Sequence, residues 1–182
     1  MGRIVSNFFI SLDGVVEAPD QWHFPYFDEE MGRVVGAGMQ TQTAFLLGRR
    51  LYDEWSAYWP SRGQDDPFAS YINDLRKYVL THRPIEGDLW NNATVLGDDP
   101  ATQIRSLKEQ GDGNIGMSGC ATTVRWLLAE GLLDELNLLV HPIAVGHGQR
   151  LFEDTGTVPL RLESSRALPT GVLHLRYTPV PA

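Results

Sequence analysis

The chain has 182 residues, of which 42% are hydrophobic and 21% are charged, and this balance excludes an intrinsically disordered protein. Acidic residues outnumber basic ones by 23 to 15, so the formal net charge is −8. No diffuse positive field is therefore available for the phosphates of a nucleic acid or for an anionic membrane surface. We expect one domain over residues 1–182 that binds neither of these partners.

The single cysteine, Cys120, excludes a disulfide within the chain and a metal site built from several thiolates. The five histidines show no spacing typical of metal ligands. We therefore expect no metal site, and we expect a cytoplasmic protein, because the chain does not depend on an oxidising compartment.

Apolar and β-branched residues recur with the periods of strands and helices along the whole chain. Asp28 is suited to cap a helix, and Asp66-Pro67 and Asp99-Pro100 are typical of helix starts. In chain order the sequence predicts a strand at 4–12, a helix at 29–41, a strand at 43–47, a short helix after Gly48 that ends at Pro60, a helix from Pro67 to about 75, strands at 77–81 and 93–96, a helix at 100–110, a strand at 114–118, a helix at 121–130, and strands at 135–141, 160–166 and 172–178.

This order predicts an α/β protein with eight strands and about five helices. The strands that alternate with helices have the spacing of βαβ units, so we expect a mostly parallel sheet. The last two strands flank Pro169-Thr170-Gly171 and predict an antiparallel hairpin at one edge.

Two glycine-rich segments are candidates for phosphate binding. Residues 111–116 match G-x-G-x-x-G, but they follow a helix and enter a strand, so we interpret them as an ordinary turn. Residues 117–123 lie between a strand and a helix, where small residues would let a pyrophosphate approach the backbone amides and the positive end of the helix dipole. The alternative is that Gly119 only makes a tight turn.

Basic and polar residues also follow two other predicted strands. Gly48-Arg49-Arg50 begins a helix, and Thr81-His82-Arg83 follows the third strand. Each segment alone could be a solvated surface. Together they predict an anion-binding rim at the ends of parallel strands, where open α/β sheets hold ligands, and they favour a phosphorylated cofactor.

Acidic residues near the first loop suggest a second kind of chemistry. Asp13 and Asp28 lie close in sequence to Trp22, and a carboxylate shielded by aromatic rings could hold a heterocycle or move a proton. A turn at Asp13 and a helix cap at Asp28 are the structural alternatives.

Residues 116–120 nearly match the G-x-S-x-G elbow of hydrolases, with Cys120 in place of the last glycine. A serine hydrolase that uses Ser118 therefore remains a weaker alternative. It would take its base from His141, His147 or His174.

The ordered set of motifs resembles the dihydrofolate reductase-like family, and within it the reductase domain of bifunctional riboflavin-biosynthesis proteins. The motifs are Ser11-Leu12-Asp13-Gly14, Gly48-Arg49-Arg50-Leu51-Tyr52-Asp53, Tyr78-Val79-Leu80-Thr81, Met117-Ser118-Gly119-Cys120-Ala121-Thr122 and His141-Pro142-Ile143 with Gly146, Gly148, Leu151 and Phe152. The resemblance covers nearly the whole chain. It implies a three-layer fold with helices on both faces of the sheet, and a homodimer.

The resemblance also implies that NADPH is the cofactor and that a hydride passes to a small acceptor: a pterin, a ribosylaminopyrimidine or another carbonyl or imine. A nucleotide-binding module without catalysis is the alternative. By the resemblance, the catalytic candidates are Asp28 and Asp13, and the substrate-binding candidates are Asn7 and Trp22. The cofactor-binding candidates are Val16, Gly48, Arg49, Arg50, Thr81, His82, Arg83, Met117, Ser118, Gly119, Cys120, Ala121, Thr122 and Thr123.

The chain departs from the family pattern at two positions. Leu51 stands where a threonine often contacts phosphate, so one hydroxyl contact is lost. Cys120 stands where a second glycine is usual, which narrows the approach of a ligand to the backbone.

Overall fold

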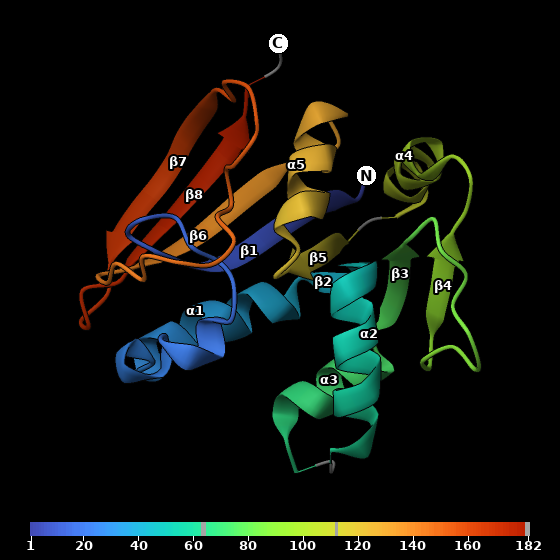
Figure 1. Ribbon diagram of the computed structural model, residues 1–182, viewed down its shortest axis with the longest axis horizontal. Helices are drawn as coiled ribbons and strands as arrows, with labels where there is room; N and C mark the ends of the chain where they lie inside the picture. The colour runs from blue at the N-terminus through green and yellow to red at the C-terminus, as the bar shows by residue number, and fades with distance from the viewer. Residues whose placement is uncertain (63–64, 112, 181–182) are drawn as a thin grey trace.

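The computed structural model describes residues 1–62, 65–111 and 113–180. Eight strands form one sheet in the order β4-β3-β2-β5-β1-β6-β8-β7 (Figure 1). They are β1 (Arg3–Ser11), β2 (Gln42–Gly48), β3 (Arg76–Leu80), β4 (Ala93–Leu96), β5 (Asn114–Ser118), β6 (Glu135–His141), β7 (Leu160–Ala167) and β8 (Leu173–Pro179). Strands β1 to β6 are parallel, whereas β8 pairs antiparallel with β6 and with β7.

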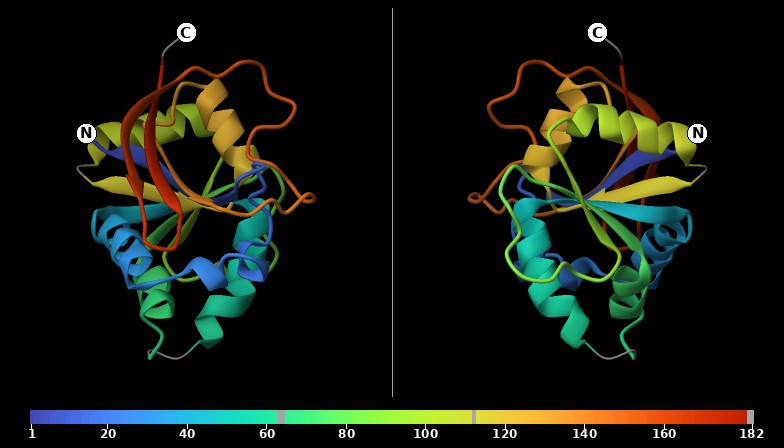
Figure 2. Two further views of the ribbon diagram at one scale, coloured as in Figure 1. Left: turned by 90° about the vertical axis from the view of Figure 1, so that its left-hand side faces the viewer. Right: turned by 90° about the vertical axis from the view of Figure 1, so that its right-hand side faces the viewer.

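Helices cover both faces of this sheet, as Figures 1 and 2 show from three directions. One face carries α4 (Pro100–Gln110) and α5 (Ala121–Ala129), and the other carries α1 (Glu29–Gln40), α2 (Arg49–Tyr58) and α3 (Pro67–Asp74). The predicted three-layer arrangement, an eight-stranded and mostly parallel sheet with helices on both faces, is therefore confirmed.

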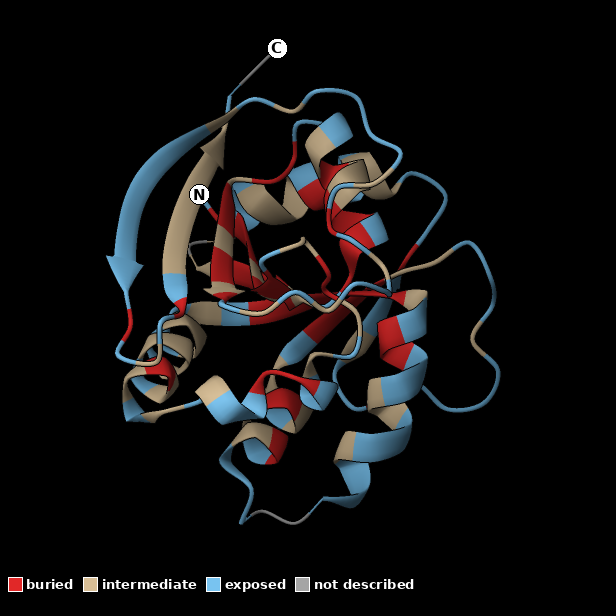
Figure 3. Ribbon diagram, turned by 60° about the vertical axis from the view of Figure 1, so that its left-hand side comes forward, coloured by how far each residue is buried: buried red, intermediate tan, exposed pale blue. Residues whose placement is uncertain are grey.

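The core lies between the central strands and the helices on both sides. In Figure 3 the buried residues gather on β1, β5, β6 and the inward sides of the helices, whereas β7 at the sheet edge is exposed almost throughout. Strand β1 pairs with both β5 and β6, and this central position explains why most of its residues are buried.

Four elements, β4, α4, β5 and β6, occupy the predicted residues without any shift. The predicted cap at Asp28 is present, and at the two predicted Asp-Pro helix starts Asp66 and Asp99 are also caps: each of the three accepts a backbone N–H at the start of α1, α3 or α4. The turn between α4 and β5 includes residue 112, which lies outside the described residues. Its flanks agree with the predicted helix-to-strand turn, because α4 ends at Gln110 and β5 begins at Asn114.

The loop after β1 has more structure than predicted. Two short 3-10 turns, Pro19–Gln21 and Phe24–Tyr26, each contain a proline, whose fixed φ suits the start of such a turn. None of the described helices has the length and apolarity that crossing a membrane requires.

Candidate functional site

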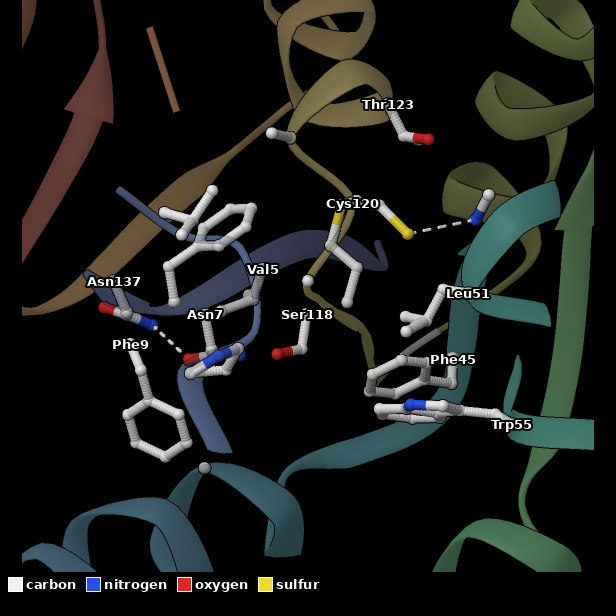
Figure 4. A pocket seen from close by; sticks show the side chains of 18 of the residues that line it. Val5, Asn7, Phe9, Phe45, Leu51, Trp55, Ser118, Cys120, Thr123 and Asn137 are labelled. Atoms are coloured by element: carbon white, nitrogen blue, oxygen red, sulfur yellow. Dashed lines mark hydrogen bonds between the residues drawn. The ribbon is translucent and has the colours of Figure 1, made fainter. Parts of the chain in front are cut away.

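A cavity of about 1590 Å³ opens on the face of the sheet that carries α1, α2 and α3. Residues of β1, β5 and β6 contribute to its floor, while α1 lines one side and α2 and α3 line the other (Figure 4). This position follows from the fold, because the two helical groups on this face leave the central strands uncovered between them.

One end of the cavity lies at the carboxyl ends of β3, β2 and β5, which are neighbours in the sheet and parallel. Residues that follow these strands line the cavity, so the structure brings the three predicted phosphate-binding segments together at one rim. The predicted cofactor residues in the lining are Val16, Gly48, Arg49, Arg50, Thr81, His82, Met117, Ser118, Gly119, Cys120, Ala121, Thr122 and Thr123. Arg83 is the exception, since it lines a smaller pocket beside α2.

The two helices that start at this rim differ from the other three in their N-termini. Helix α2 follows Gly48 and α5 follows Cys120, and among the described residues no side chain caps either helix. By contrast, aspartate side chains cap α1, α3 and α4. Backbone N–H groups at two helix starts, together with the positive ends of two helix dipoles, are the features that bind a diphosphate.

The two turns are also packed tightly against one another. The Gly48 N–H donates to Sγ of Cys120 at 3.3 Å (Figure 4), and a Cβ added to Gly48 would lie 2.7 Å from Oγ1 of Thr123. Burial raises the pKa of the Cys120 thiol to about 11, so this thiol stays protonated at neutral pH. The cysteine at the usual glycine position therefore links the two turns and is not a nucleophile.

The three predicted phosphate-binding arginines have different surroundings. Arg49 donates from Nε to both carboxylate oxygens of Asp53, at 2.8 and 3.0 Å, and from Nη1 to the carbonyls of Arg83 and Pro84. Its guanidinium thus clamps the loop after β3 to the start of α2. Arg50 is 72% exposed and has only surface ion pairs with Glu54, at 3.1 Å, and Glu17, at 3.5 Å. Of the two predicted phosphate-binding arginines that line the cavity, Arg50 is the one available to a ligand.

Polar side chains form a row across the cavity floor. Ser118 on β5 is opposite Asn7 on β1, Asn7 is opposite Asn137 on β6, and Asn137 is opposite Arg176 on β8. The amide of Asn137 donates to Oδ1 of Asn7 at 3.1 Å, and Figure 4 shows both side chains beside Ser118. This polar row offers uncharged donors and acceptors to a bound molecule.

Sequence reasoning found Asn7 and Ser118 but missed Asn137, Arg176 and Glu135. Burial alone would raise the pKa of Glu135, but hydrogen bonds and charge from Arg176, together with the charge of Arg3, hold it below its usual value. Glu135 therefore stays ionised between two arginines and is a poor proton donor. The available signal was the alternation of polar and apolar residues in 135–139, which places Glu135, Asn137 and the odd-numbered residues of β1 on one face.

Three predicted catalytic or substrate residues lie outside the cavity lining. The Asp28 carboxylate accepts the N–H of Met31 at 2.8 Å as the cap of α1. Asp13 accepts from the Ser11 hydroxyl and from the N–H groups of Val145 and Gly146, and these hydrogen bonds lower its pKa to about 2. Asp13 therefore stabilises a turn and Asp28 caps a helix, which are the structural alternatives to the predicted catalytic roles.

Trp22 is also part of the structure and not of the cavity wall. It is buried, and its indole N–H donates to the carbonyl of Glu17 at 3.2 Å. It packs beside His141, which is fully buried and holds its Nδ1 2.8 Å from the Leu139 carbonyl oxygen. This aromatic cluster fixes the loop after β1 on the sheet.

The geometry gives Ser118 none of the three candidate bases of a hydrolase. His141 is enclosed in the aromatic cluster, and His147 lies outside the cavity lining. His174 does line the cavity, but it is on β8, and β5 and β8 are separated by β1 and β6. Three strand spacings amount to about 14 Å, which is far beyond a hydrogen bond.

The buried histidines make stability depend on pH. Burial lowers the pKa of His141 and of His23, so the unfolded chain binds protons that the folded chain excludes. We therefore expect the free energy of unfolding to fall as pH drops below about 6.5, by up to about 1.4 kcal/mol per pH unit for each histidine. Urea unfolding at pH 7 and pH 5 measures this, and His141→Phe should reduce the pH dependence. An unchanged dependence in His141→Phe, or the same reduction in the exposed-loop control His147→Phe, would contradict this assignment.

Among the described residues, no group of three histidine, cysteine, aspartate or glutamate side chains gathers closely enough to hold a metal ion.

Comparison with known proteins agrees with this fold and places the chain in a family. The uncharacterized protein YyaP of Bacillus subtilis is 26% identical over 180 residues, which cover 96% of this chain and 94% of that protein. A putative riboflavin biosynthesis protein from Shewanella sp. PV-4 has a similar structure, with a TM-score of 0.76, 18% identity, and coverage of 98% of this chain and 99% of that one.

A dihydrofolate reductase from Enterococcus faecalis, solved as a complex with NADP(H), has a TM-score of 0.63 at 13% identity and covers 98% of this chain and 97% of its own. At these identities the two solved structures show a common fold. The model of the RibD C-terminal domain matches residues 3–174, which is nearly the whole chain. The protein therefore belongs to the RibD C-terminal domain family.

Proposed function

We propose that the protein is an NADPH-dependent reductase. The observation that carries the proposal is the pair of uncapped helix N-termini, α2 after Gly48 and α5 after Cys120, at the ends of two neighbouring parallel strands. Gly119, between β5 and α5, is exposed and has φ +68°, so its backbone is open to close approach by a ligand. These features suit the diphosphate of a dinucleotide, and Arg50 suits its additional phosphate.

The residues of the chain would bind and orient both reactants. A reduced nicotinamide, when bound, supplies a hydride. The polar row on the floor would hold the acceptor by hydrogen bonds from Asn7, Asn137 and the Ser118 hydroxyl. We propose that water in the open cavity supplies the proton, because Asp13 and Asp28 lie outside the lining and Glu135 is kept ionised by its arginines. The acceptor class that the resemblance implies, a pterin, a ribosylaminopyrimidine or another carbonyl or imine, stays part of the proposal.

Titration of the purified protein with NADPH and NADH, followed by heat, tests the cofactor assignment. We expect tighter binding of NADPH, because Arg50 can pair with the 2′-phosphate that NADH lacks. Arg50→Gln should weaken NADPH binding by about tenfold, as expected for one lost charge-assisted hydrogen bond, and leave the affinity for NADH unchanged. Arg76→Gln, an exposed arginine on β3, is the matched control. Equal affinities for the two nucleotides, or equal losses in Arg50→Gln, would contradict the role of Arg50.

Addition of candidate acceptors to the NADPH-bound protein separates the reductase from a nucleotide-binding module without catalysis. A reductase must oxidise bound NADPH when a suitable acceptor is added, whereas a binding module leaves it reduced with every acceptor. We also retain the homodimer and the cytoplasmic location as proposals; the reducing cytoplasm would keep the single thiol free.

A further inference from the structure

The side of the cavity formed by β2, α2 and α3 is built from aromatic rings. We call this side the aromatic wall and define it by six residues, all of which line the cavity: Phe45, Trp55, Tyr58, Trp59, Phe68 and Tyr71. The ring of Phe45 stacks on Trp55 with centroids 5.6 Å apart and an interplanar angle of 29°, as Figure 4 shows. Trp55 also meets Phe68 edge to face at 5.6 Å.

The remaining rings continue this packing without a break. Trp59 contacts Trp55, Phe68 and Tyr58, with centroids 6.2, 4.8 and 4.8 Å apart, and Phe68 contacts Tyr71 at 5.9 Å. Each ring holds its neighbours, so the wall is a rigid surface that loses little conformational freedom when a ligand binds.

A core function accounts for Phe45, which is 4% exposed, but not for the wall as a whole. Leu51, Trp55 and Tyr58 lie on one face of α2, yet only Leu51 is buried, whereas Trp55 is half-buried and Tyr58 is 46% exposed. Large aromatic rings left open to a cavity cost free energy in water and are typical of ligand-binding surfaces.

A fixed amide lies next to the aromatic wall. The Tyr71 hydroxyl donates to Oε1 of Gln42 at 2.5 Å, which leaves the Nε2 hydrogens of Gln42 as its available donors. Gln42 lines the cavity and lies directly over Gly116 of β5, where an added Cβ would be 2.2 Å from the Gln42 Cδ atom. Gly116 is thus needed for the Gln42 amide to occupy this position.

We propose that the aromatic wall and Gln42 form a binding subsite for a neutral, planar aromatic ring that carries a carbonyl group. The ring would stack on the wall, and the carbonyl would accept a hydrogen bond from Gln42. Every side chain of this subsite is uncharged, so it selects for planarity and a hydrogen-bond acceptor, not for charge. The existence of the subsite does not depend on the proposed function. Only the assignment of the bound ring as the acceptor of the reductase rests on that function.

Calorimetric titration with quinolin-2-one, in the absence of NADPH, tests the subsite. Quinolin-2-one is a neutral aromatic lactam, and piperidin-2-one is its matched control with the lactam but no aromatic ring. We expect saturable binding of the aromatic lactam only. Trp55→Leu and Phe68→Leu should each weaken it by about tenfold, as expected from a lost aromatic contact, and Gln42→Leu should weaken it as well. Phe152→Leu removes an aromatic ring outside the cavity lining and should have no effect.

Each outcome decides the inference. Equal binding of the two lactams, no binding of quinolin-2-one, or equal affinity in the wild type, Trp55→Leu and Phe68→Leu would overturn it. Thermal unfolding of each variant shows whether it is folded, and NADPH titration of Trp55→Leu should give the wild-type affinity. If the wild type fails to bind NADPH, the proposed function fails, but the lactam titration still decides the subsite because it is made without the nucleotide.

Discussion

Gly119→Ala is expected to weaken NADPH binding by at least about tenfold, while Gly131→Ala leaves it unchanged. The two glycines lie at opposite ends of α5 and have nearly the same backbone conformation, with φ +68° and φ +64°. An added methyl group strains both positions alike, by about 1 to 2 kcal/mol. Only Gly119 is at the cavity rim, where the methyl group would stand between the ligand and the backbone amides.

The comparison isolates the effect on the ligand from the effect on the fold. Thermal unfolding should show similar losses of stability in the two variants, since a Cβ at Gly119 would meet only the Leu51 side chain at an ordinary distance of 3.6 Å and a Cβ at Gly131 would meet nothing within 4 Å. Calorimetric titration then measures NADPH affinity. If both variants bind NADPH as the wild type does, the β5–α5 turn is not the diphosphate site.

Lys77→Met is expected to lower the free energy of unfolding by about 2 to 4 kcal/mol. Lys77 is fully buried, and its Nζ donates to the carbonyls of Ile72 and Leu75, each at 2.7 Å, and of Asn73, at 3.1 Å. Its ammonium also lies 4.4 Å from the centre of a Trp90 ring. Methionine is unbranched and only one atom shorter than lysine, but it leaves these carbonyls at the end of α3 without their donor.

Urea unfolding measures the loss, and Arg76→Met is the control. Arg76 is the adjacent residue of the same strand, carries the same charge and is exposed, so its replacement should change stability by less than about 0.5 kcal/mol. Similar losses in the two variants would show that Lys77 acts through charge on the surface of the strand and not as a buried cap of α3. Because α3 carries part of the aromatic wall, Lys77 also supports one side of the cavity.

Local sequence patterns sufficed for the elements that depend on short-range interactions. Asp28 was predicted as a helix cap, and Asp66 and Asp99 as the positions where helices start; all three cap their helices, because a cap needs only its own first turn. The predicted hairpin around residues 169–171 formed for a similar reason: the turn and its two flanking strands are contiguous in sequence.

For residues that had both a structural and a catalytic interpretation, only the tertiary structure could decide between the two. Asp13 precedes a glycine whether its role is structural or catalytic. Only the fold shows that its carboxylate accepts hydrogen bonds from the N–H groups of Val145 and Gly146, more than a hundred residues away. Arg49 and Arg50 are adjacent and chemically identical. Yet Arg49 is held by the loop after β3, whereas Arg50 is free to meet a ligand.

The sequence by itself therefore determined the order of elements, the β/α class and the three segments that meet at the rim, because periodicity and turn chemistry are local properties. Strand order was decided only by the tertiary structure, since pairing joins residues that are distant in the chain. That order places Ser118, Asn7, Asn137 and Arg176 in one row, and it opens the space between α1 and α2 in which the aromatic wall faces them.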